Sequence, residues 1–68
     1  MYSETLQKQT KQYFQAFPMA MMKQFATDRF GAGQLERDGS YSVRVFNSDE
    51  VVTFKTIDAL LDEGWVID

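Results

Sequence analysis

Apolar side chains in the first part of the chain recur at intervals close to one helical turn. Between residues 3 and 16 they form one narrow stripe, separated by polar positions rich in Gln and Lys. Ser3 is a residue type that favours the start of a helix. The pattern predicts a first helical arm over about 3–16, with an apolar stripe formed by Leu6, Tyr13, Phe14 and Phe17.

Pro18 interrupts this pattern, because proline lacks the backbone N–H and clashes with the preceding turn of a helix. It either kinks one long helix or occupies the first position of a second helix. The apolar positions that follow predict a second helical arm over about 18–30. Gly31 or Gly33 can end this arm in a left-handed conformation.

Two lines of apolar side chains run along this second predicted arm. The first continues the stripe toward a sheet and comprises Phe17, Met21 and Phe25. The second comprises Met19, Met22, Ala26 and Phe30. Together the lines cover roughly 200° of a helix surface, whereas a helix lying on one sheet needs little more than about 100°. The second line is therefore predicted to contact the other arm, a second copy of the chain or another protein.

Alternating apolar and polar residues characterise the second half of the chain. "YSVRVF" and "VVTFK" are predicted strands, and "DG" at 38–39 is a turn that joins a short strand at 35–37 to them. If Ser48–Asp49 forms a two-residue turn, Val45 lies opposite Val52 and Val43 lies opposite Phe54. One face of this hairpin is then core, and its members are Tyr41, Val43, Val45, Val52 and Phe54.

A short helix and a last strand complete the predicted order. Thr56 caps a helix at about 57–63, and Gly64 ends it. "WVI" then returns as a strand beside the hairpin. The predicted fold is one small α+β domain over 1–68, with a helical part at about 3–30 and a β-β-α-β part at about 35–68. Its long N-terminal helix, kinked or broken near Pro18, packs on an antiparallel sheet of 3–4 strands.

The composition narrows the chemistry that this domain can perform. The 68 residues include no Cys and no His, which excludes disulfides and the usual zinc ligands and removes the commonest general base. Asp58 and Asp62 share a helix face, but nothing nearby supplies the further oxygens of a calcium loop. The sequence therefore predicts no catalytic residues, no metal, no cofactor and no enzyme.

Charge and hydropathy also bear on partners and location. The net charge is −3; residues 1–37 carry five basic and three acidic residues, and residues 38–68 carry two basic and seven acidic ones. No apolar run approaches the roughly 18 residues of a membrane span, and no signal-peptide pattern is present. These features predict a cytoplasmic protein without a membrane partner.

The leading functional hypothesis is a non-catalytic protein-binding module, such as an adaptor, regulator or inhibitor. Accessory proteins of phages and mobile elements offer an analogy for such small chains. The predicted partner-binding residues are Met19, Met22, Ala26 and Phe30, and the chain is expected to form a homodimer through them.

Two alternatives remain. The outer hairpin face, with Arg44, Phe46 and Lys55, could bind single-stranded nucleic acid, although the acidic net charge disfavours this. Alternatively, the chain could be a structural subunit of a larger assembly.

Overall fold

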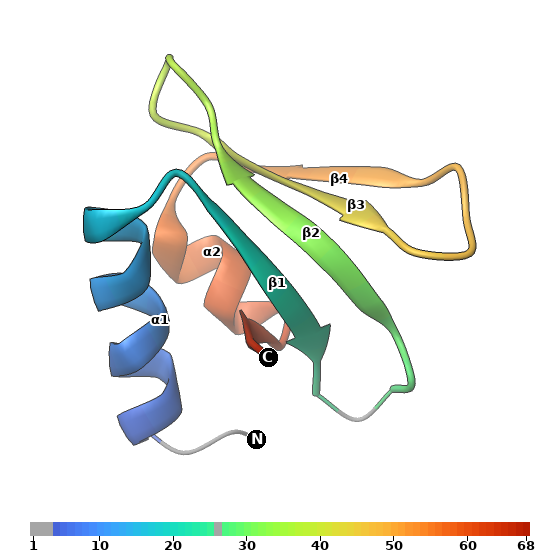
Figure 1. Cartoon of the computed structure of the whole chain (residues 1–68), viewed down its shortest axis with the longest axis horizontal. Helices are drawn as coiled ribbons and strands as arrows, with labels where there is room; N and C mark the ends of the chain where they lie inside the picture. Colours follow the sequence, from blue (N-terminus) through green and yellow to red (C-terminus); the bar gives the residue numbers. More distant parts are fainter. Residues whose placement is uncertain (1–3, 26) are drawn as a thin grey trace.

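The structure, a computed structural model, describes residues 4–25 and 27–68. A five-stranded antiparallel sheet has the strand order β4-β3-β2-β1-β5. Figure 1 shows α1 along one side of the molecule, with β4 and the β3–β4 loop far from it. The elements are α1 (Glu4–Ala16), β1 (Met19–Gln24), β2 (Phe30–Leu35), β3 (Tyr41–Val45), β4 (Val51–Phe54), α2 (Ile57–Asp62) and β5 (Trp65–Ile67).

The first predicted helical arm is confirmed as α1. Thr10 and Phe14 are its buried residues, and their spacing of four places them on one face of the helix. The Phe14 ring meets Tyr41 of β3 edge-on, with ring centroids 5.3 Å apart. The chain leaves the helix just before Pro18, which agrees with the restriction that proline places on the preceding residue.

The second predicted helical arm is wrong. Its range of about 18–30 instead contains β1 and the start of β2, and Ala26 lies outside the described residues. β1 and β2 pair from Met19↔Gln34 to Lys23↔Phe30. Met and Ala favour helices, so tertiary pairing overrides local propensity here.

Gly31 and Gly33 are strand residues rather than the predicted helix caps. They lie on the face of β2 that meets the core, where side chains would not fit. A Cβ atom on Gly33 would lie 2.3 Å from Met22 Sδ and 3.2 Å from Phe14 Cζ. A Cβ atom on Gly31 would lie 2.7 Å from the carbonyl oxygen of Arg44. Gly33 therefore makes room for Met22 and for Phe14 of α1, whereas Gly31 allows the backbone of β3 to approach closely.

The β3–β4 hairpin has the predicted core face but a register shifted by two residues. Val43 lies opposite Val52, and Tyr41 lies opposite Phe54. The Val45 N–H donates to the Glu50 carbonyl at 3.0 Å, which closes a four-residue loop instead of the predicted two-residue turn. Asn47 in this loop has a φ of 62°. A shift of two preserves the faces because side chains alternate with a period of two.

The C-terminal elements follow the sequence prediction closely, apart from their place in the sheet. The Ala59 N–H donates to Thr56 Oγ1 at 3.1 Å, and Gly64 ends the helix region with a φ of 89°. β5 then pairs with β1, from Met22↔Ile67 to Gln24↔Trp65, and not with the hairpin as predicted. β5 and β4 are thus opposite edges of the sheet.

Both helices contribute to a core on the same face of the sheet. The elements confirm an α+β fold. The sheet has five strands where 3–4 were predicted, and the N-terminal helical part ends at Ala16 rather than at about residue 30. Among the described residues, no helix is both long enough and apolar enough to cross a membrane. The buried apolar residues are Phe14, Ala20, Met22, Val43, Val45, Phe54, Leu60, Leu61, Trp65 and Val66.

Candidate functional site

The face of the sheet turned away from the helices carries exposed side chains on β1 to β4, and we call this part of it the open face. Alternation along each strand and the pairing registers assign its residues. Its members on the paired strands are Met19, Met21, Lys23, Phe30, Ala32, Gln34, Ser42, Arg44, Val51 and Thr53. Phe46 extends it beyond β3, since the Phe46 N–H donates to the Phe30 carbonyl at 2.8 Å.

Large apolar side chains are exposed over much of the open face. Met21 and Val51 are 58% and 57% exposed, and they belong to one cross-strand row, Met21–Ala32–Arg44–Val51. Phe30 and Phe46 are 46% and 37% exposed. Scattered exposed apolar residues are ordinary on proteins, but a group on adjoining strands is typical of an interaction surface.

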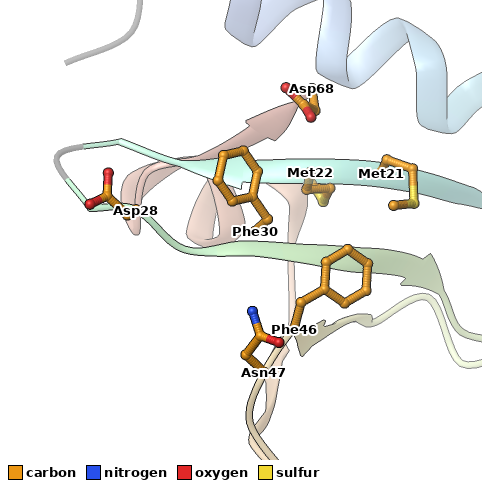
Figure 2. A pocket seen from close by; sticks show the side chains of 7 residues that line it. All are labelled: Met21, Met22, Asp28, Phe30, Phe46, Asn47 and Asp68. Atoms are coloured by element: carbon orange, nitrogen blue, oxygen red, sulfur yellow. The ribbon is translucent and has the colours of Figure 1, made fainter.

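A hollow of about 300 Å³ lies at the end of the open face nearest Phe30 and Phe46. Figure 2 shows the aromatic rings of Phe30, from β2, and Phe46, directly after β3, with Asp28 and Asp68 near the rim. Met22 also borders this hollow, but its side chain is 1% exposed and belongs to the core. The hollow is therefore an apolar depression with acidic groups at its margin.

Charged groups surround the open face without filling it. Arg44 is exposed in the middle of the cross-strand row and forms no ion pair within the described chain. At the periphery, Arg29 pairs with Glu50, and Lys23 Nζ lies 3.9 Å from Asp68 Oδ1. An isolated arginine within an apolar surface suits a partner that offers an acidic group.

The predicted partner-binding residues are divided by the strand conformation of this segment. Met19 and Phe30 lie exposed on the open face, whereas Met22 is buried under the sheet beside Gly33. Ala26 lies outside the described residues. These residues do not form one line. In a strand every second side chain shares a face, whereas the prediction assumed the 3.6-residue period of a helix.

The sequence reasoning assigned Met21 to the core together with Phe17 and Phe25, and this assignment is wrong. All three side chains are more than two-fifths exposed. Val51 belonged to neither predicted site, although it is exposed on the open face. The alternation of "MAMMK" was the available signal, since it places Met19, Met21 and Lys23 on one side of a strand.

The residues of the alternative nucleic-acid face lie on or beside the open face. Arg44 and Phe46 belong to it, and Lys55 is exposed directly after β4. Phe30 adds a second exposed aromatic side chain that the sequence reasoning had not placed there. The negative charges of Asp28 and Asp68 at the hollow would repel a phosphate backbone.

Titratable side chains of the described chain are dispersed. No three acidic residues among residues 4–25 and 27–68 lie close enough together to hold a metal ion. Asp58, which the sequence paired with Asp62, instead lies 3.0 Å from Lys11 Nζ. At the β2–β3 turn, the Ser40 hydroxyl and N–H donate to Asp38 at 2.6 and 2.9 Å and hold the pKa of Asp38 below its usual 3.8.

Comparison of the chain with protein-family models, curated proteins and solved structures gave no match.

Proposed function

We propose that this chain is a non-catalytic protein-binding module that uses the open face of its sheet. The observation that carries the proposal is the exposure of Met19, Met21, Phe30, Phe46 and Val51 on one uncovered face. Such a surface gains free energy when a partner removes it from water. Methionine side chains are flexible and polarisable, so they can adapt to a partner's shape.

The charged side chains of the open face indicate which kind of surface the partner presents. Arg44 lies among the apolar side chains, so the matching surface is apolar with an acidic group near its centre. The partner we propose is a folded protein or an amphipathic segment of one, which the chain would regulate, inhibit or connect to another protein.

Single-stranded nucleic acid is the second candidate ligand. Two exposed aromatic side chains, Phe30 and Phe46, favour it, because bases can stack on aromatic rings. The acidic rim of the hollow and the net charge of −3 weigh against it.

Affinity capture from the native host tests the proposal. The variant Met21→Glu/Phe30→Glu changes two exposed residues, so it should fold as the unaltered chain does and lose the captured partner. Lys8→Glu on the exposed side of α1 is the matched control, because it changes the net charge by the same amount. The control should keep the partner.

Two outcomes would overturn this function. A partner that both variants retain equally would show that binding uses another surface. A labelled oligonucleotide that binds at low salt, and is lost on Arg44→Glu, would instead support the nucleic-acid function.

A further inference from the structure

The two edges of the sheet differ in how their backbone groups are satisfied. At the β5 edge, the Ile67 N–H donates to Thr10 Oγ1 at 3.1 Å, and α1 lies against the strand. At the β4 edge, no described strand or helix pairs with the outward side. An unprotected edge strand is a template for pairing with another chain.

The register of the sheet shows which backbone groups of β4 point outward. The Val45 N–H bonds to the Glu50 carbonyl, so Val43–Val52 and Tyr41–Phe54 are the following hydrogen-bonded pairs of this antiparallel ladder. The N–H and C=O groups of Val51 and Thr53 therefore point away from β3. No residue of the described chain hydrogen-bonds the N–H of either one.

We propose that two copies of the chain associate through their β4 edges, as an antiparallel pair related by a two-fold axis at Val52. Residues with outward-pointing backbone groups must oppose one another, so the axis can lie at Val51, Val52 or Thr53. With the axis at Val52, Val51 of each copy lies opposite Thr53 of the other. Two five-stranded sheets then become one continuous sheet.

Charge complementarity selects this register among the three. With the axis at Val52, Lys55 of each copy, directly after β4, approaches Asp49 of the other, in the loop before β4, at both ends of the paired strands. With the axis at Val51, Lys55 lies opposite Asn47, and with the axis at Thr53 it lies opposite Val51. Asp49 and Lys55 are both exposed and take part in no ion pair of the described chain. Opposite charges facing across strands stabilise one pairing over its neighbours.

This dimer leaves the open face uncovered, so it does not depend on the proposed partner-binding function. It places two copies of that face side by side on one sheet. A dimer through one short strand on each side is weak, and its population should rise with concentration.

Sedimentation equilibrium over a dilution series, with a charge-reversal set, tests the proposal. The unaltered chain should dimerise, and Asp49→Lys or Lys55→Glu should each weaken dimerisation about tenfold, because two attractive contacts become repulsive. An equimolar mixture of the two single variants should dimerise again, since every facing pair is then of opposite charge. The double variant Asp49→Lys/Lys55→Glu should also dimerise by itself.

A backbone variant tests the edge independently of charge. Thr53→Pro removes an N–H that points outward, so it should abolish dimerisation and leave the pairing with β3 intact. Thr53→Val keeps that N–H and should still dimerise. Far-UV circular dichroism checks the fold of each variant, and the charge-swapped double variant decides the result if Thr53→Pro does not fold.

Three results would overturn the proposal. The first is a chain that stays monomeric at every concentration. The second is a mixture of single variants that associates no better than either variant alone. The third is a Thr53→Pro chain that folds and dimerises like the unaltered protein, which would place the contact on another surface.

Discussion

One face of the sheet is buried and the other is exposed, although similar residues occupy both. On the covered face, Gly33 leaves room for Met22 and for Phe14 of α1. On the open face, Met21 is a neighbour of Met22 in sequence and is 58% exposed, against 1% for Met22. Hydrophobicity alone therefore does not determine burial; the side of the strand does.

The difference between the faces shows where the chain gains its stability. A chain of 68 residues has a folding free energy of roughly 3–10 kcal/mol, so a single well-buried side chain supplies a large share of it. The open face contributes apolar surface that folding leaves in water. That surface is available for binding because the fold does not need it.

The sharpest test of this comparison makes the same substitution on both sides of β1. Met22→Ala should lower the free energy of unfolding by about 2–5 kcal/mol, because it removes buried atoms and leaves a cavity. Met21→Ala should change it by less than about 0.5 kcal/mol. Urea denaturation followed by circular dichroism measures both, and equal losses would refute the assignment of the two faces.

Removing one hydroxyl group, that of Thr10, should weaken the β5 edge of the sheet, which α1 covers. Thr10 Oγ1 donates to the Leu6 carbonyl at 2.8 Å and accepts from the Ile67 N–H. Thr10→Val should cost about 1–3 kcal/mol of stability, because it leaves the N–H of Ile67 without a partner.

Thr10→Ser is the control for this edge, because it keeps the hydroxyl and loses one methyl group. It should retain more of the stability than Thr10→Val in the same denaturation experiment. A reversed order would mean that packing around Thr10, and not its hydrogen bond, holds β5 against α1.

The smallest expected effect lies in the β2–β3 turn, which belongs to neither face. Hydrogen bonds from Ser40 lower the pKa of Asp38, so ionised Asp38 stabilises the folded state. This contribution is fully present above the unfolded pKa of about 3.8 and is lost as the pH falls through the lower folded value. NMR titration of the Asp38 carboxyl should therefore give a pKa below 3.8.

Asp38→Asn tests the same contact through stability. Near neutral pH the variant should be slightly less stable than the unaltered chain, and the difference should vanish in acid below the folded pKa. A difference that persists unchanged in acid would assign the effect to the conformation of the turn.

Structural features were predicted correctly where the local sequence pattern fits only one conformation. Thr56 caps α2 and Gly64 ends the helix region, because a hydroxyl acceptor and a left-handed backbone suit few other residues. The core face of the β3–β4 hairpin was also predicted correctly. Its register was not, because loops of two and four residues both keep the alternation of faces.

The segment from Met19 to Phe30 was wrongly predicted as a helix, and its strand conformation divides the predicted partner-binding residues between the two faces of the sheet. Its apolar residues satisfy both a helical period and an alternating one, and Met and Ala favour the helix. Half of the predicted partner-binding set, Met19 and Phe30, is nevertheless exposed on the open face. Arg44 and Phe46, predicted for a nucleic-acid face, share that surface.

The sequence by itself determined the α+β class, the first helix, the hairpin face and the caps of α2, because each depends on neighbours along the chain. The tertiary structure decided that "MAMMKQ" is a strand, since only pairing with β2 and β5 satisfies its backbone groups on both sides. It also decided which methionine is core, because Gly33 provides space for Met22 from the neighbouring strand. Contacts between distant residues thus separate the stabilising face of this sheet from the face left open.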